Sequence, residues 1–143
     1  MPFSTYLIVM VGGAFGTLAR YGLSVAALPL SHRFPWSTLV INVLGSFIIG
    51  FFGALTLAHG RYPAPENLRL FVMVGLCGGF TTFSSFSLQT LELLQGGAFN
   101  RAVLNIIGSV VLCLLAVALG HYAAVKLNGD AKRIAQILIE EEA

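Results

Sequence analysis

The residues best suited to chemistry in this sequence are uncharged hydrogen-bond donors beside phenylalanine rings, in a run that begins at a glycine pair. Serine and threonine hydroxyls donate hydrogen bonds without carrying a charge, and the edge of a phenylalanine ring is electropositive. Together these groups would line a path for a small, strongly hydrated anion that must lose its water. Phenylalanines three residues apart are also typical of core packing, which is the competing interpretation. The run is Gly78-Gly79-Phe80-Thr81-Thr82-Phe83-Ser84-Ser85-Phe86-Ser87.

Two asparagines add amide groups to apolar segments elsewhere in the chain, Asn42 in one and Asn105 in another. An amide in hydrocarbon is costly unless it finds a partner or water, so each marks either a contact between helices or an aqueous path. Ser109 and Cys113 follow Asn105 at intervals of four residues and therefore share its helix face. Glycines spaced in the same way have a simpler explanation, because small residues let helices pack closely in a membrane.

Several classes of function are not expected. No histidine or aspartate lies at depth to activate a serine, which argues against an intramembrane enzyme. The eight lysines and arginines are scattered as far as the C-terminal tail, which argues against a nucleic-acid partner. Cys77 and Cys113 both lie in apolar stretches, where we predict small buried hydrophobes rather than metal ligands or a disulfide.

The elements that must position these residues are transmembrane helices. Of the 143 residues, 57% are hydrophobic and only 10% are charged, against roughly 25% charged in ordinary globular chains. Lipid must therefore be the solvent for much of the surface. An apolar segment of about 20 residues spans a bilayer core. We predict an all-α integral membrane protein with four such segments, at about residues 5–27, 37–58, 68–94 and 102–125.

The third segment is predicted to be broken in mid-membrane. Two adjacent glycines followed by two β-branched threonines form a weak helix. A break leaves carbonyls unpaired at the end of the first half and amides unpaired at the start of the second. Lipid cannot satisfy these groups, so the break must face protein, water or an ion. Either Thr81 or Thr82 is placed to cap the second half-helix.

Four spans put both termini on one side of the membrane. Basic residues near the span ends are nearly balanced between the two sides, so the bias that normally sets orientation is almost absent. Such a chain is free to insert both ways up, which permits an antiparallel dimer. We predict a channel domain at 1–126 and a charged amphipathic tail at 127–143. Asn128-Gly129 would end the last span, followed by a short helix with Ile134, Ile137 and Leu138 on one side.

The chain resembles the Fluc fluoride channels, also called CrcB proteins, over nearly all of its length to about Val125. The run from Gly78 to Phe86 is similar to the most specific signature of that family. Two other stretches look like its first-helix and second-helix patterns. They are Gly12-Gly13 through Gly16 to Arg20-Tyr21, and Asn42-Val43-Leu44-Gly45-Ser46-Phe47 with Gly50.

The resemblance implies a dual-topology antiparallel homodimer in the bacterial inner membrane, with two fluoride pores and surrounding lipid. It also implies a central structural sodium ion at the dimer interface. Gln89 stands where a number of members have glutamate. The implied roles are a pore amide at Asn42, aromatic edges at Phe83 and Phe86, polar lining at Thr82, Ser84, Asn105 and Ser109, a vestibule charge at Arg20, and sodium-binding backbone carbonyls at Gly78 and Thr81.

The expected function is passive, fluoride-selective export that relieves fluoride toxicity. One alternative is a proton-coupled transporter of the small multidrug type, which is also a four-helix antiparallel dimer. That mechanism needs a membrane-embedded carboxylate, and the first span contains none. The other alternative is an accessory membrane subunit, which would leave the donor-lined break without a purpose.

Overall fold

The computed structural model describes the backbone of residues 3–57 and 62–142, with side chains described through residue 129. Every regular element in these ranges is helical. Four helical stretches are long and apolar enough to cross a membrane: Phe3–Ala26, Trp36–Leu55, Glu66–Gln95 and Phe99–Gly129. The predicted four-span, all-α class is therefore confirmed.

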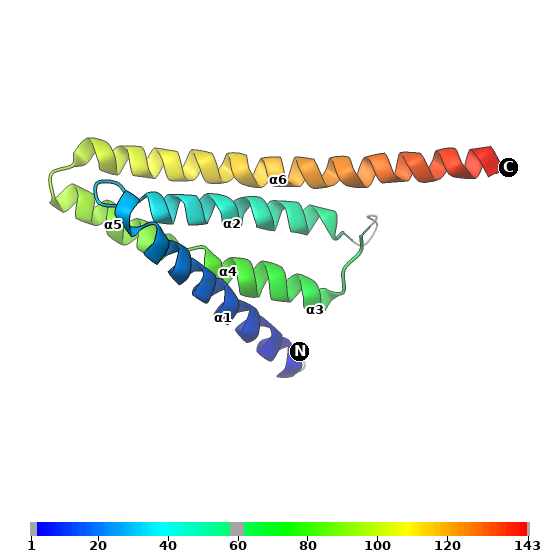
Figure 1. Cartoon of the computed structure of the whole chain (residues 1–143), viewed down its shortest axis with the longest axis horizontal. Helices are drawn as coiled ribbons and strands as arrows, with labels where there is room; N and C mark the ends of the chain where they lie inside the picture. Colours follow the sequence, from blue (N-terminus) through cyan, green and yellow to red (C-terminus); the bar gives the residue numbers. More distant parts are fainter. Residues whose placement is uncertain (1–2, 58–61, 143) are drawn as a thin grey trace.

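The helices form two packed pairs (Figure 1). Helix α2 (Trp36–Leu55) runs along α6 (Phe99–Glu142), and these two share the most extensive contact in the molecule. Helix α1 (Phe3–Ala26) packs obliquely against the first half of the third span. A short 3-10 turn, Leu28–Leu30, leads from α1 toward α2. The third span thus lies between α1 and the α2–α6 pair, where both can fix its shape.

The third span is interrupted, as predicted. It consists of α3 (Glu66–Arg69), a π-helical stretch Leu70–Leu76, α4 (Cys77–Phe80) and α5 (Phe83–Gln95). Between α4 and α5, Thr81 and Thr82 are extended, with φ/ψ of −79°/156° and −152°/110°. The chain therefore changes direction at the two threonines, while both glycines of the pair remain helical in α4.

Gly79 lies directly against α1. A Cβ there would collide with the carbonyl oxygen of Gly13, and a Cβ at Gly16 would collide with that of Leu76. The α2–α6 pair is built in the same way, since a Cβ at Gly50 would strike the Val117 carbonyl. The glycine spacing read from the sequence thus reports close helix packing.

The last carbonyls of α2 are satisfied by side chains from other helices. Asn128 Nδ2 donates to the carbonyls of Ala54 and Leu55, at 3.2 and 3.4 Å. Arg69 donates to the Gly53 carbonyl at 3.1 Å and also bonds to the Thr56 hydroxyl. These groups would otherwise be unpaired at the helix end.

The stretch of α6 that is long and apolar enough to cross a membrane ends at Gly129, where the last span was predicted to end. The separate short helix predicted after Asn128-Gly129 is wrong, because α6 continues without interruption to Glu142. Asn128 uses its amide for α2. The predicted side for Ile134, Ile137 and Leu138 lies outside the side chains that the structure describes.

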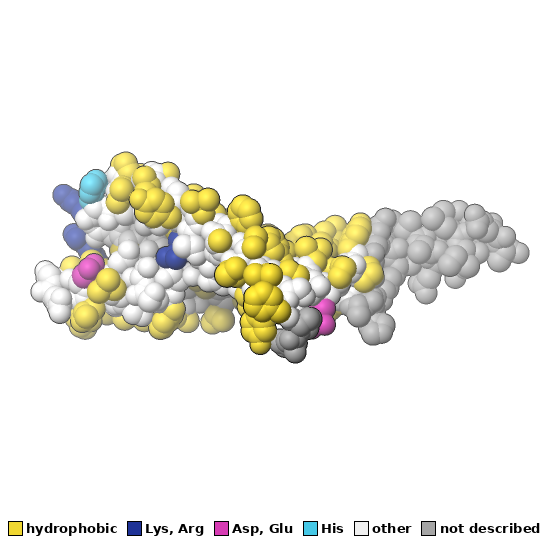
Figure 2. All heavy atoms as spheres, turned by 90° about the horizontal axis from the view of Figure 1, so that it is seen from below, with side chains coloured by type: hydrophobic (Ala, Val, Ile, Leu, Met, Phe, Trp, Pro, Cys, Tyr) yellow, Lys and Arg dark blue, Asp and Glu magenta, His cyan; other side chains and the backbone are white. Residues whose placement is uncertain are grey.

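The outer surface is apolar. Figure 2 shows a face on which hydrophobic side chains and uncharged atoms cover most of the described surface, and on which charged side chains are few. Large hydrophobic residues are exposed along α1 and α6, among them Leu18 at 67% and Leu114 at 63%. This pattern suits contact with lipid, which accepts apolar side chains without cost.

Candidate functional site

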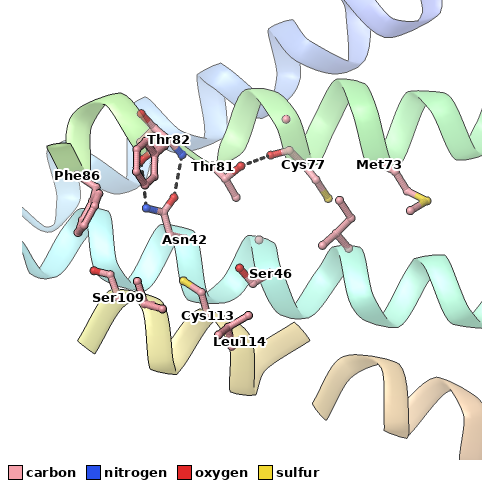
Figure 3. A pocket seen from close by; sticks show the side chains of 15 residues that line it. Asn42, Ser46, Met73, Cys77, Thr81, Thr82, Phe86, Ser109, Cys113 and Leu114 are labelled. Atoms are coloured by element: carbon pink, nitrogen blue, oxygen red, sulfur yellow. Dashed lines mark hydrogen bonds between the residues drawn. The ribbon is translucent and has the colours of Figure 1, made fainter. Parts of the chain in front are cut away.

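The break in the third span is held by a single side chain from α2. The Thr82 amide donates to Asn42 Oδ1 at 2.8 Å, and Asn42 Nδ2 donates to the Thr82 carbonyl at 3.1 Å (Figure 3). The asparagine amide thereby replaces the backbone partners that Thr82 loses where the helix is interrupted. Asn42 is half-buried, so its position is fixed while part of it still faces open space.

The two threonines close the ends of the half-helices in different ways. Thr81 Oγ1 donates to the Cys77 carbonyl at 2.9 Å, which adds a second bond to the end of α4. Thr82 Oγ1 accepts a bond from the Ser85 amide at 3.2 Å and so caps α5. Of the two capping residues that the sequence left open, the structure selects Thr82. Ser84 Oγ lies 3.2 Å from the same hydroxyl.

Arg20 reaches the break from the opposite side. Its Nε donates to the Gly79 carbonyl at 3.1 Å, and Thr17 Oγ1 approaches the same oxygen at 3.5 Å. A cation at the carbonyl end of a helix is favoured by the helix dipole. Arg20 is half-buried. The structure therefore places its guanidinium against the end of α4, rather than in the cavity described next.

A cavity of about 440 Å³ lies beside the break, between α2, the third span and α6. It brings together most of the residues singled out in the sequence, and Figure 3 shows side chains from the three elements converging on it. No lysine, arginine, histidine, aspartate or glutamate lines it. The predicted residues in its wall are Asn42, Gly78, Thr81, Thr82, Phe83, Phe86 and Ser109.

The two phenylalanines form a tilted pair at the start of α5. The ring centroids of Phe83 and Phe86 are 5.2 Å apart, with 45° between the ring planes. Phe86 is half-buried, whereas Phe83 is 77% exposed. A ring that is exposed to this extent does not serve the core of its own chain, so the packing interpretation does not account for Phe83.

Asn105 lies apart from the cavity wall. It is 2% exposed, and its Nδ2 donates to Thr90 Oγ1 at 2.9 Å, which joins α6 to α5. Ser109 Oγ donates weakly to Asn105 Oδ1 at 3.4 Å and also lines the cavity. The sequence left two explanations for Asn105, a contact between helices or an aqueous path. The structure shows the contact between helices.

Two backbone carbonyls at the break, those of Gly78 and Thr81, are available for further bonds. Among the residues that the structure describes, neither accepts a hydrogen bond from a backbone amide at the turn between α4 and α5. The amide that would normally reach Gly78 is that of Thr82, which bonds to Asn42 instead. Gly78 is exposed, and a Cβ there would meet nothing within 4 Å. Oxygen atoms are thus available at the open side of the break.

Sequence reasoning did not assign Met73 to the wall and noted Ser46 only within the second-helix pattern. Both line the cavity, and Ser46 lies one helical turn from Asn42. Cys77 and Cys113, predicted as small buried hydrophobes, also line it; Cys77 is 2% exposed and Cys113 is half-buried. At Gly45, another residue of the wall, a Cβ would collide with the Thr81 methyl group.

We expect Gly45→Ala to displace Thr81 and to lower stability by about 1–3 kcal/mol, the usual cost of overpacking. Thr81→Ser removes the methyl group in the way but keeps the hydroxyl that bonds to Cys77. The double variant should therefore recover most of the melting temperature in thermal unfolding of detergent-solubilised protein. Gly22→Ala is the matched control, since that position is open. A double variant no more stable than Gly45→Ala would refute this role.

Comparison with known proteins gives one consistent result. The family described as CrcB-like protein, Camphor Resistance (CrcB), matches residues 7–121. A protein of Gluconobacter oxydans named fluoride-specific ion channel FluC is 65% identical over 144 residues, covering all of both chains. Proteins of the same name are 64% identical in Methylobacterium radiotolerans, over 99% of each chain, and 57% identical in Opitutus terrae, over 87% of this chain and 96% of that one.

Proposed function

This chain belongs to the CrcB-like protein family, and from that premise we propose that it is a fluoride-selective channel that exports fluoride passively. It is a multi-pass bacterial membrane protein and a channel rather than an enzyme. The observation that carries the proposal is the cavity at the break, whose wall holds hydroxyls, an amide and two phenylalanine rings but no charged side chain.

Such a wall suits fluoride because it replaces water without trapping the ion. Asn42 uses one N–H for the Thr82 carbonyl, and an amide nitrogen has a second N–H to offer. Ser109 adds a hydroxyl whose own hydrogen bond to Asn105 is weak, at 3.4 Å, and the ring edges of Phe83 and Phe86 add positive potential. Conduction requires binding that is favourable enough for entry and weak enough for exit, which uncharged donors can provide. Chloride is larger and would fit a narrow set of donors poorly.

Passive flow needs no further machinery. The membrane potential supplies about 2.3 kcal/mol per charge per 100 mV, which drives an anion out of a cell that is negative inside. Fluoride enters cells in acid surroundings as neutral hydrogen fluoride and is trapped on ionisation, so an outward leak relieves its toxicity.

Glu92 is exposed near the end of α5, and Glu66 is exposed at the start of α3. Neither lies in the cavity wall, which disfavours the proton-coupled alternative.

A second copy of the chain is part of the proposal. Phe83 is 77% exposed beside the cavity, and Gly78 is open in the same span, on the other side of the break. These groups are placed to be covered by a partner, and the nearly balanced basic residues allow that partner to be antiparallel. We propose a dual-topology homodimer with a channel domain at 1–126 in each copy, a tail at 127–143, and lipid around the dimer.

The carbonyls of Gly78 and Thr81 fit a structural sodium ion at the centre of this dimer. Both lack a backbone partner in the described residues, and hard cations prefer oxygen ligands. Two antiparallel copies would contribute two such pairs. The ion would supply positive charge where the two breaks cross, while Asn42 and Arg20 hold the backbone of each break in place.

Reconstitution of the full chain into vesicles tests the proposal. We expect fluoride to leave loaded vesicles rapidly when a potassium ionophore balances charge, and chloride to leave no faster than from protein-free vesicles. An ion-selective electrode measures each rate. The same vesicles prepared with potassium in place of sodium should conduct less if sodium is structural. Fluoride efflux equal to that of empty vesicles would reject the channel.

A further inference from the structure

A second, smaller cavity of about 270 Å³ lies at the end of the molecule where α1 connects to α2. One wall is the connection at 31–35, and the other is the second half of α5. Its character differs from that of the cavity at the break, because charged side chains line it. They are Arg33 from the connection and Glu92 from α5, with His32 beside Arg33.

The two cavities follow one another along α5. Phe86 lines the cavity at the break, and Gln89 lines the second cavity. Residues three apart on a helix are neighbours on the same face, so the two cavities lie about one turn apart along α5. Leu93 continues that face in the second cavity. An ion that leaves the break past Phe86 would next meet Gln89.

Gln89 has an unused acceptor at this junction. Its Oε1 is buried and has no hydrogen-bond partner among the described residues. A bare anion offers nothing to such an oxygen, since both are acceptors. A hydrated anion differs, because each water that points one hydrogen at the ion has a second hydrogen directed outward. Gln89 Oε1 and the Glu92 carboxylate are acceptors for those outward hydrogens.

The wall that carries the positive charge is well anchored. Phe34 is 9% exposed, and its ring lies 4.8 Å from that of Trp36. Ser31 Oγ accepts a bond from the Ser37 amide at 3.2 Å, which ties the connection to the first turn of α2. Arg33, between these anchors, is exposed. The backbone that carries Arg33 is therefore fixed beside the cavity.

We infer that this second cavity is an antechamber for hydrated fluoride, in which Arg33 concentrates the anion and Gln89 accepts hydrogen bonds from its water shell. The inference rests on the proposed function. It places the loss of water between Gln89 and Phe86, and it gives the connection at 31–35 a part in conduction.

Charge substitutions in the full-length channel test the antechamber. At about 10 mM salt, where the Debye length is about 30 Å, Arg33→Gln should lower fluoride efflux about threefold, and Glu92→Gln should raise it by a similar factor. Both effects should vanish near 1 M salt, where the Debye length is about 3 Å. Gln89→Leu should lower efflux about equally at both salt concentrations, because it removes a contact with water and changes no charge.

Arg101→Gln is the matched control, because Arg101 is exposed at the same end of the molecule but lines a different hollow, at 96–101. Its effect at low salt should be clearly smaller than that of Arg33→Gln. Equal effects of the two arginine variants, or wild-type efflux in Gln89→Leu, would overturn the antechamber. A wild-type chain that fails to conduct fluoride would instead reject the proposed function.

Discussion

Phe83→Ile and Phe86→Ile are each expected to lower fluoride efflux from vesicles by about tenfold or more, while the dimer still assembles. Isoleucine keeps the apolar character and much of the volume but has no electropositive ring edge. Both rings line the cavity at the break, and their centroids are 5.2 Å apart. A loss of about 1.4 kcal/mol of stabilisation at the barrier corresponds to a tenfold slower rate.

Phe3→Ile provides the control for this prediction. Phe3 is 76% exposed, almost the same as Phe83 at 77%, but it lies at the start of α1, away from the cavity. Its efflux should equal that of wild type. Size-exclusion chromatography in detergent would verify assembly of all three variants. Wild-type efflux in both Phe83→Ile and Phe86→Ile would count against a role for the rings.

Asn42→Leu is expected to abolish efflux and to lower the melting temperature. The substitution leaves the Thr82 amide and carbonyl without the partners that lie at 2.8 and 3.1 Å. Each buried group that loses its partner costs about 1–3 kcal/mol. Lipid cannot replace the lost bonds, so the break itself should rearrange. Thermal unfolding and vesicle efflux together would measure both consequences.

Asn42→Asp separates the two roles of this residue. A carboxylate still accepts from the Thr82 amide but cannot donate to the Thr82 carbonyl or to an anion. We expect efflux to be lost, with a smaller fall in melting temperature than in Asn42→Leu. Asn67→Asp adds the same charge at an exposed position on α3 and should conduct normally. Efflux near the wild-type rate in Asn42→Asp would show that the amide donor is dispensable.

The transmembrane spans could be predicted from the sequence because a segment that crosses lipid must be apolar over its whole length. A stretch of about 20 apolar residues has few stable alternatives to a membrane-crossing helix. The predicted segments 37–58 and 68–94 compare with helical spans at Trp36–Leu55 and Glu66–Gln95. The break was also predictable, since Gly-Gly-Phe-Thr-Thr contains four residues of low helix propensity. The sequence offered Thr81 or Thr82 as the cap of the second half-helix but did not show that both glycines remain helical and that only the threonines are extended.

Contacts between segments that are distant in the sequence could not be predicted from residue type and local spacing. Asn42 and Asn105 are the same residue type in similar apolar surroundings, yet one bridges the break and the other joins α6 to α5. Asn128 was expected at the end of the last span, and its bonds to the last carbonyls of α2 were not. In each case the partner lies on another helix, so spacing along the sequence could not identify it.

The sequence by itself determined that the chain crosses a membrane four times, that the third crossing is interrupted, and that the interruption is lined by neutral donors and aromatic rings. These properties follow from residue type and local spacing, which act within a few turns of helix. Only the tertiary structure decided which polar groups satisfy the interruption and which are left over for an ion. That choice depends on the close approach of α1 and α2 to the third span, where Asn42 takes the Thr82 amide and leaves the Gly78 carbonyl unpaired.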